Sequence, residues 1–178
     1  MGQAKLARVA DSTLVIIDVQ ERLAAVMAER ETVVARMAIL VEAAKLLDVP
    51  VVVTEQYPKG LGPTDARIAA ALPPTARIVE KSRFSACGAL ALDRDQVILT
   101  GMEAHVCVLQ TALELAAAHR QVFVVADAVC SRDSANRRNG LARLRQEGVT
   151  ITNTESMVFE WLRESTHAHF RTLSKLIR

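Results

Sequence analysis

Short, unbroken hydrophobic runs alternate along the chain with longer segments in which hydrophobic residues recur every three or four positions. An unbroken run predicts a β-strand that is covered on both faces, as in parallel sheets. Six such strands are predicted, the third from a weaker pattern: residues 14–17, 51–53, 77–80, 97–99, 122–126 and 149–152.

The segments between these runs have helical spacing. Residues 33–47 keep a hydrophobic stripe with charged residues outside it, and a second stripe starts at His105. A third helix is predicted from about Ser134 to residue 147, where Gly148 ends it, and two short helices follow. Residues 56–66 contain two prolines and two glycines and predict a loop. Strands alternating with helices predict an α/β fold, with helices on both faces of one parallel sheet.

Composition supports one domain over residues 1–178, because 51% of the residues are hydrophobic and no interdomain linker is present. The 22 basic and 20 acidic residues nearly cancel, and only 3% of residues are aromatic. These values do not fit a nucleic-acid surface of basic patches and stacking rings, so no nucleic-acid partner is expected. One arginine cluster is interpreted as the solvated face of a helix: Arg132, Arg137, Arg138, Arg143 and Arg145.

The three cysteines form no C-x-x-C pair, which favours reduced thiols in the cytoplasm. Residues 1–12 contain no hydrophobic signal core, and Leu6 stands where a myristoylation signal needs Ser or Thr. No hydrophobic run approaches the length that spans a membrane, so no membrane partner is expected.

Three chemically complementary residues follow predicted strands. Asp18 and Lys81 come directly after the first and third strands, and Cys107 lies a few residues beyond the fourth. Ligands of open parallel sheets bind at the carboxyl ends of the strands, where all three residues should meet. There a carboxylate can accept a thiol proton and an ammonium can hold the carboxylate, while N–H groups at a helix start can bind an oxyanion. Such a set can transfer an acyl group through a thioester.

Each residue also has a purely structural interpretation. Buried cysteines are commonly inert hydrophobes, an aspartate at a strand end commonly caps a turn, and a lysine is by default solvated. Only the joint placement of Asp18, Lys81 and Cys107 favours a catalytic role.

The chain resembles an isochorismatase-like cysteine hydrolase, a superfamily that includes nicotinamidases and N-carbamoylsarcosine amidases. The matching segments are LVIIDVQERL, VEKSRFSA, LTGMEAHVCVLQTALEL and ADAVCSR, around Asp18, Lys81, Cys107 and Asp127. The resemblance implies a three-layer αβα sandwich with a six-stranded parallel sheet. It also implies Asp18 as base, Lys81 as orienting cation and Cys107 as nucleophile. A cis peptide between Met102 and Glu103 is implied as well, with the backbone N–H groups of Glu103 and Cys107 forming the oxyanion hole.

The loop after the second strand departs from the nicotinamidases, which carry an Asp-x-His metal motif there. This chain has TEQYPKGLGPT, and no histidine precedes residue 105. His167-x-His169 is the one closely spaced pair, and a surface helix pair explains it. We therefore expect no metal and no cofactor. Isochorismate cleavage is also disfavoured, because in the family that reaction does not rely on a cysteine.

The resulting hypothesis is a cysteine-dependent hydrolase of a C–N bond in a small amide, carbamoyl or imide compound. The alternative is an oligomeric binding or scaffold protein with little turnover. A flavodoxin-like nucleotide binder is disfavoured, since DVQER replaces a glycine-rich phosphate loop after the first strand. The resemblance further implies a homo-oligomer. Finally, the helix start and Lys81 favour the Cys107 thiolate, while Asp18 opposes it unless Asp18 takes up the proton. We therefore predict a depressed pKa for Cys107, titrating as a coupled pair with Asp18, and structural roles for Cys87 and Cys130.

Overall fold

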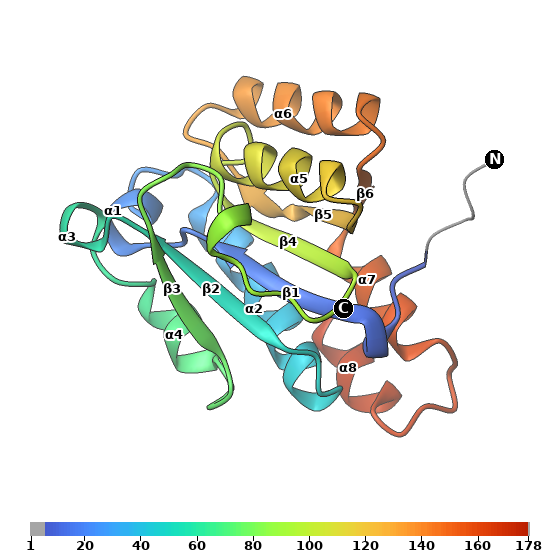
Figure 1. The fold of residues 1–178 in the computed structure, drawn as a ribbon. Coiled ribbons are helices and arrows are strands. Elements are labelled where there is room, and N and C mark those ends of the chain that lie inside the picture. Colours follow the sequence, from blue (N-terminus) through green and yellow to red (C-terminus); the bar gives the residue numbers. More distant parts are fainter. Residues whose placement is uncertain (1–5, 178) are drawn as a thin grey trace.

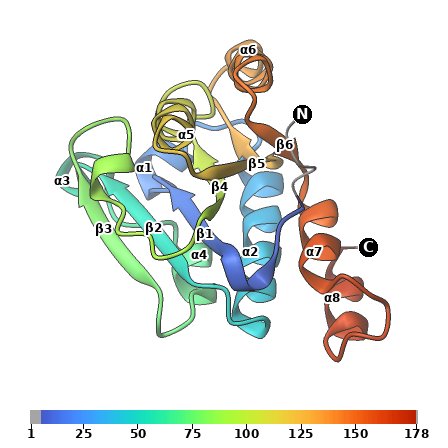
Figure 2. The ribbon, with the colours of Figure 1, turned by 45° about the vertical axis from the view of Figure 1, so that its right-hand side comes forward.

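The computed structural model describes residues 6–177. Residues 1–5 and Arg178 lie outside this range, so the expectation about a signal core in residues 1–12 falls partly outside the described residues. Six parallel strands form one sheet in the order β3-β2-β1-β4-β5-β6. Helices cover both of its faces, so the predicted three-layer sandwich is confirmed (Figures 1 and 2). The strands are β1 (Ser12–Ile17), β2 (Val51–Gln56), β3 (Arg77–Lys81), β4 (Gln96–Met102), β5 (Gln121–Cys130) and β6 (Thr150–Thr152).

One helical layer packs on each face of the sheet, and each layer has its own hydrophobic core. The helices are α1 (Glu21–Ala24), α2 (Arg30–Leu46), α3 (Pro58–Leu61), α4 (Ala66–Ala71), α5 (Cys107–Ala117), α6 (Ser134–Gln146), α7 (Thr154–Leu162) and α8 (Phe170–Leu176). Short 3-10 turns cover Val9–Asp11 and Cys87–Ala89. The core on one face is built from α2, α4, α7 and α8, and the core on the other from α5 and α6. Strands β1 and β4 are buried along their whole length, which explains their unbroken hydrophobic runs.

Several segments differ from the sequence-based expectations, which did not include helices α1 and α4. The fifth strand does not stop at Asp127 but continues to Cys130. Its pairing with β4 shifts register, since Leu99 pairs with Val124 while Gly101 pairs with Val129. The intervening residues form an irregular bulge, and the strand then resumes. The segment predicted as a loop over residues 56–66 also contains α3, which begins with a proline at its first helical position.

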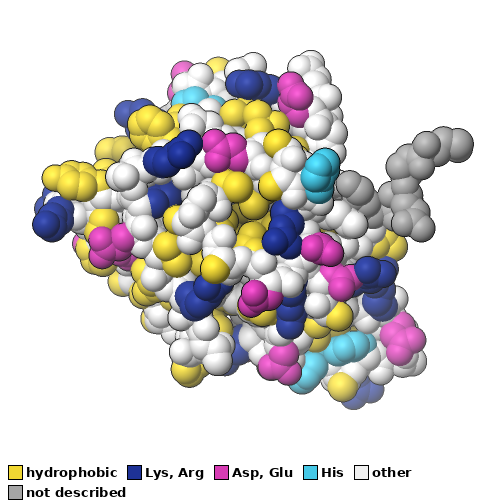
Figure 3. Space-filling view, in the orientation of Figure 1, with side chains coloured by type: hydrophobic (Ala, Val, Ile, Leu, Met, Phe, Trp, Pro, Cys, Tyr) yellow, Lys and Arg dark blue, Asp and Glu magenta, His cyan; other side chains and the backbone are white. Residues whose placement is uncertain are grey.

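Within residues 6–177, no helix combines the length and hydrophobicity that crossing a membrane requires. The space-filling view shows Lys and Arg side chains interspersed with Asp and Glu, with no continuous basic surface on that face (Figure 3).

Candidate active site

The register of three neighbouring strands brings Asp18 and Lys81 together. Ile17, which precedes Asp18, pairs with Thr54 of β2, and Gln56 of β2 pairs with Lys81 of β3. Lys81 Nζ lies 2.6 Å from Asp18 Oδ2, and both side chains are buried. Two residues 63 positions apart in the sequence therefore form one buried ion pair.

The Lys81 ammonium group is fully engaged by protein acceptors. Besides Asp18 it donates to Gln56 Oε1 at 2.7 Å, to the Phe84 carbonyl at 3.0 Å and to the Arg83 carbonyl at 3.2 Å. An ammonium has three N–H donors, so four acceptors leave none for a substrate. This arrangement suits a cation that holds Asp18 in place, and it does not suit a binding site for an anionic substrate.

Asp18 accepts a second hydrogen bond within the core. Thr54 Oγ1 donates to Asp18 Oδ1 at 2.7 Å, so each carboxylate oxygen has its own donor. Burial raises the pKa of Asp18 above its usual value of 3.8, although the Lys81 charge and hydrogen bonds from Lys81, Thr54 and Cys107 act against this rise. A carboxylate whose pKa is raised is a better proton acceptor for a neighbouring thiol.

Cys107 is the first residue of α5 and only 7% exposed. The charges of both Asp18 and Lys81 act on its thiol, which places the third candidate residue at the same site. The prediction of a depressed pKa is wrong. Burial and the Asp18 charge raise the pKa of Cys107 to about 12, against the lowering effects of Lys81 and a backbone hydrogen bond from Glu103. The helix start is outweighed because the site is dry and already holds a carboxylate. The resting thiol is therefore protonated.

The turn between β4 and α5 carries the candidate oxyanion hole. The peptide bond between Met102 and Glu103 is cis. The Glu103 carbonyl accepts hydrogen bonds from the N–H groups of Val106 and Val108, at 3.1 and 3.2 Å, which closes the turn. Among residues 6–177, the N–H groups of Glu103 and Cys107 donate to no backbone carbonyl. The Glu103 N–H group instead acts on the Cys107 sulfur, whose pKa it lowers, so this donor already faces the candidate nucleophile.

The side chains of this turn are fixed by the residues that end β5. The Glu103 carboxylate accepts from Arg132 N–H at 2.9 Å and from Arg132 Nε at 3.2 Å. His105 Nδ1 lies 2.9 Å from Ser131 Oγ. Arg132 lies just before α6, as the sequence predicted, and its largely solvated side chain also binds Glu103. It remains 64% exposed.

Two residues of this site were missed by the sequence analysis: Thr54, which binds Asp18, and Gln56, which binds Lys81. A signal for both was present in the sequence. They are polar residues at the end of a buried hydrophobic run, on the strand that separates the Asp18 strand from the Lys81 strand. The missing information was the strand order, which the hydrophobic pattern does not contain.

The other two cysteines lie in different surroundings. Cys130 is fully buried in the core of the α2 face, and burial raises the pKa of its thiol to about 12. Cys87 is half-buried beside Glu114, and burial together with that charge raises its pKa. All three cysteines are free thiols.

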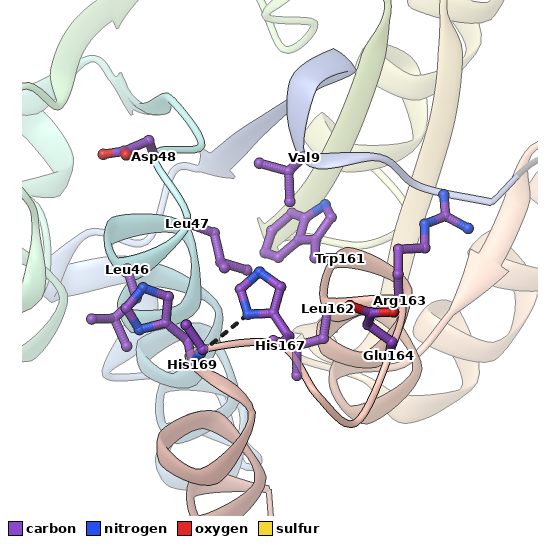
Figure 4. Close-up of a pocket in the computed structure, with 11 residues that line it drawn as sticks. Val9, Leu46, Leu47, Asp48, Trp161, Leu162, Arg163, Glu164, His167 and His169 are labelled. Atoms are coloured by element: carbon purple, nitrogen blue, oxygen red, sulfur yellow. Dashed lines mark hydrogen bonds between the residues drawn. The ribbon is translucent and has the colours of Figure 1, made fainter.

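The histidines are dispersed over the molecule. His167 and His169 lie 5.8 Å apart, ring centre to ring centre, and line a groove of about 510 Å³ with Trp161 and Asp48 (Figure 4). This groove lies at the amino edge of the sheet, since Asp48 precedes β2, and so it is opposite to Cys107. In the described part of the chain, no three His, Cys, Asp or Glu side chains are grouped so that they could hold a metal ion.

Together, fold and site define an αβα sandwich that carries a cysteine, an aspartate and a lysine at the carboxyl edge of its sheet. A family model described as the isochorismatase domain matches residues 12–156. The chain belongs to the isochorismatase family, which confirms the resemblance seen in the sequence.

Three relatives illustrate the similarity. The chain is 37% identical over 185 residues to isochorismatase domain-containing protein 2A of Mus musculus, covering 99% of this chain and 88% of the mouse protein. It is 40% identical over 177 residues to the secreted isochorismatase effector Isc1 of Phytophthora sojae, covering 94% and 84%. A solved structure of MAR1 ribonuclease from Caenorhabditis elegans matches with a TM-score of 0.91 and 34% identity, covering 97% and 92%.

Proposed function

We propose that this protein is a cysteine-dependent hydrolase that cleaves a C–N bond in a small amide, carbamoyl or imide compound through a thioester. Membership of the isochorismatase family supports a hydrolase at the general level. The observation that carries the finer proposal is the buried Lys81–Asp18 pair, 2.6 Å apart, whose two charges act on the buried Cys107 thiol beside it.

In the proposed reaction Cys107 Sγ attacks the substrate carbonyl carbon while Asp18 takes the thiol proton. A protonated resting thiol and a carboxylate of raised pKa suit this order, because the proton moves only as the new C–S bond forms. The N–H groups of Glu103 and Cys107 stabilise the tetrahedral oxyanion. When the C–N bond breaks, the leaving nitrogen takes the proton from Asp18 and a thioester remains on Cys107.

The second half of the reaction reverses these roles. Asp18 takes a proton from water as the water oxygen attacks the thioester carbonyl. The C–S bond then breaks, the carboxylic or carbamic acid is released, and Cys107 recovers its proton from Asp18. Lys81 keeps Asp18 oriented in both halves and offsets its charge.

The alternative, a binding or scaffold protein with little turnover, accounts less well for this site. Removing an aspartate and a lysine from water is costly, and hydrophobic side chains of similar size can replace a buried pair without loss of stability. A scaffold gains nothing from a buried Asp–Lys pair beside a thiol, whereas a hydrolase needs all three groups.

The Caenorhabditis elegans relative is named a ribonuclease. We do not favour an RNA substrate for this chain. The Lys81 ammonium has no donor left for a phosphate. Basic and acidic residues also nearly cancel over the chain, so the net charge supplies little attraction for a nucleic-acid backbone. We therefore propose a small-molecule substrate, and we keep single-stranded RNA as a comparison in the assay.

The test is ammonia or amine release from a panel of small primary amides, ureido compounds and cyclic imides. Cys107→Ala should reduce turnover to the uncatalysed level, whereas Asp18→Asn and Lys81→Met should each lower kcat/KM by at least about a hundredfold. Cys87→Ala is the matched control, since it removes a thiol outside the site, and it should match the wild type. Turnover that survives in Cys107→Ala, or cleavage of RNA with no turnover of the panel, would contradict the proposal.

We further propose that the protein works in the cytoplasm as a homo-oligomer. Three free thiols and no disulfide in the described residues fit a reducing compartment. Secretion is stated only in the name of the Phytophthora sojae relative, so fractionation of cells that express a tagged copy is needed to decide the compartment.

A further inference from the structure

The turn that carries the candidate oxyanion donors is held from outside the site by one continuous segment, residues 130–140. The Cys130 carbonyl accepts from Ala104 N–H at 2.8 Å, Ser131 Oγ binds His105, and Arg132 binds Glu103. Three successive residues of this segment therefore fix three successive residues of the turn.

Gly140 supplies a fourth contact, from the middle of α6. It is buried, and a Cβ atom added there would lie 3.0 Å from His105 Cα, 3.1 Å from the Ala104 carbonyl oxygen and 3.2 Å from His105 Cβ. Two of these three neighbours are backbone atoms of the turn. Glycine inside a helix is less favourable than alanine, and here it allows the helix and the turn to approach closely.

Helix α6 cannot easily withdraw to make room for a side chain at position 140. Arg137, one turn earlier, donates from Nε to the Val129 carbonyl at 2.9 Å and from its guanidinium to the Ala126 carbonyl. Arg137 is only 23% exposed, so this residue, assigned to a solvated face from the sequence, in fact anchors α6 to the bulge of β5. The buried side chains of Leu141 and Leu144 attach the same helix to the core.

We infer that Gly140 is a positioning residue for the nucleophile. The missing side chain lets α6 support the turn of residues 103–106 at the distance that keeps the Glu103 N–H group and the Cys107 thiol aligned with Asp18. This inference rests on the proposed function. A methyl group at position 140 would displace the turn by a few tenths of an ångström, because its backbone atoms are the nearest neighbours. Misplacements of that order are costly for groups that act in one geometry.

The experiment measures the rate at which iodoacetamide alkylates Cys107 as a function of pH, with peptide mapping to separate the three cysteines. In the wild type the Glu103 N–H group lowers the pKa of Cys107. In Gly140→Ala the thiolate should lose alignment with this group, so the pKa of Cys107 should rise. The profile should therefore move to higher pH, and the rate near pH 8 should fall about tenfold. A loss of stability alone would leave the profile of the folded protein unchanged.

Gly88→Ala is the matched control, because a Cβ atom there meets nothing within 4 Å, and its profile should overlay the wild type. Should Gly140→Ala fail to fold, Ser131→Ala removes the His105 contact without adding bulk, and it should move the profile in the same direction. A pH profile of Gly140→Ala that overlays the profile of Gly88→Ala would overturn the inference. If Gly140→Ala does not fold, a Ser131→Ala profile that overlays the wild type would overturn it instead. Because alkylation needs no substrate, failure of the amide panel would count against the proposed function and not against this role of Gly140.

Discussion

At the scale of single residues, the chemistry of the site depends on how the Asp18 carboxylate is kept in a dry environment. Burial favours its protonated form, and Lys81 and Thr54 each supply a donor that favours the charged form. A base in the proposed reaction must be charged before the thiol proton arrives. The number of donors on Asp18 should therefore set the lower limit of the pH range in which the protein is active.

The first prediction concerns Thr54. In the wild type, kcat/KM should fall on the acid side with a midpoint above pH 3.8, because the pKa of Asp18 is raised and only the ionised form is active. Thr54→Val keeps the shape and removes the donor, so the pKa should rise further and this midpoint should move to higher pH. We expect kcat/KM on the plateau to fall about tenfold, the effect of one lost hydrogen bond to a charged group. The measurement is the pH profile of amide turnover.

Thr100→Val is the control for this prediction. Thr100 is equally buried, on strand β4 at the other side of β1, but its hydroxyl donates to the neutral carbonyl of Val15 at 3.4 Å. The same chemical change there should alter stability without moving the acid midpoint. Equal shifts in both variants would show that the Thr54 hydroxyl has no specific influence on Asp18.

The residue scale also shows what the sequence could and could not predict. Asp18, Lys81 and Cys107 each follow a hydrophobic run, so their shared edge could be expected before the structure was known. The direction of the Cys107 pKa shift could not. It depends on the extent of burial and on how strongly the Asp18 charge outweighs that of Lys81, and neither can be read from the order of residues.

At the scale of elements, the loop after β2 decides whether a metal is needed. Glu55 accepts from Thr64 N–H at 2.7 Å and from Thr64 Oγ1 at 2.6 Å. Asp65 caps α4 through Arg67 N–H and pairs with Arg30 at 2.7 Å. Both carboxylates of this region are thus used by the loop itself, and hard carboxylates without imidazole make a poor zinc site.

The second prediction follows from this loop. Dialysis against a chelator should leave kcat/KM for the best substrate of the panel unchanged, and added zinc should not raise it. Metal analysis of the purified protein gives an independent measurement. Activity that is lost on chelation and returns with zinc would contradict the proposed metal-free mechanism.

The third prediction concerns the contact between β4 and β1. Gly101 has φ +118°, and a Cβ atom there would lie 2.1 Å from the Ile17 carbonyl oxygen and 2.6 Å from its nitrogen. Gly101→Ala should lower the free energy of unfolding by about 3 kcal/mol or more, because backbone strain and overpacking add. Urea denaturation is the measurement, with Gly88→Ala as the control. An effect below about 1 kcal/mol would mean that the two strands separate easily here.

Elements were predicted from sequence with uneven success, for physical reasons. All six strands were predicted. Strands β1, β2, β4 and β5 are mostly buried and have continuous hydrophobic runs, whereas the edge strand β3 is largely exposed and has a weaker pattern. The continuation of β5 to Cys130 was missed, since Asp127 interrupts the run and binds Thr154 at the start of α7. Helix α3 was missed because a single turn beside two glycines has no hydrophobic period.

At the scale of the whole molecule, the two edges of the sheet have different properties. The carboxyl edge gathers Asp18, Lys81 and Cys107, which come from three separate segments. The amino edge holds the groove of Figure 4 around Trp161, which has no nucleophile. The carboxyl edge brings a buried carboxylate, an ammonium and a thiol together, so we place the proposed chemistry on that side of the sandwich.

The last prediction is that the protein is a dimer or a larger closed homo-oligomer. Several large hydrophobic side chains are more than half exposed, which is unfavourable in water unless a second surface covers them: Leu6, Val26, Tyr57, Ile78 and Phe84. The strand that carries Ile78, β3, is also an edge of the sheet with one unpaired side, and native edges are usually protected. A symmetric association of identical chains would cover such groups without another partner.

Sedimentation velocity at about micromolar concentration is the measurement for this prediction, since interfaces of standard size give dissociation constants in or below that range. The expected result is a mass at least twice the 19.4 kDa of one chain, unchanged on dilution. The variants Ile78→Lys and Tyr57→Ser then locate the interface. Each places a charge or a small polar group where a hydrophobic contact is expected, so a variant that lowers the mass shows that the substituted residue lies in the interface. Glu42→Lys, a charge change on an already charged and exposed face of α2, is the control and should keep the oligomer. A single species of 19.4 kDa in the wild type would contradict the prediction and leave these hydrophobic side chains exposed to water.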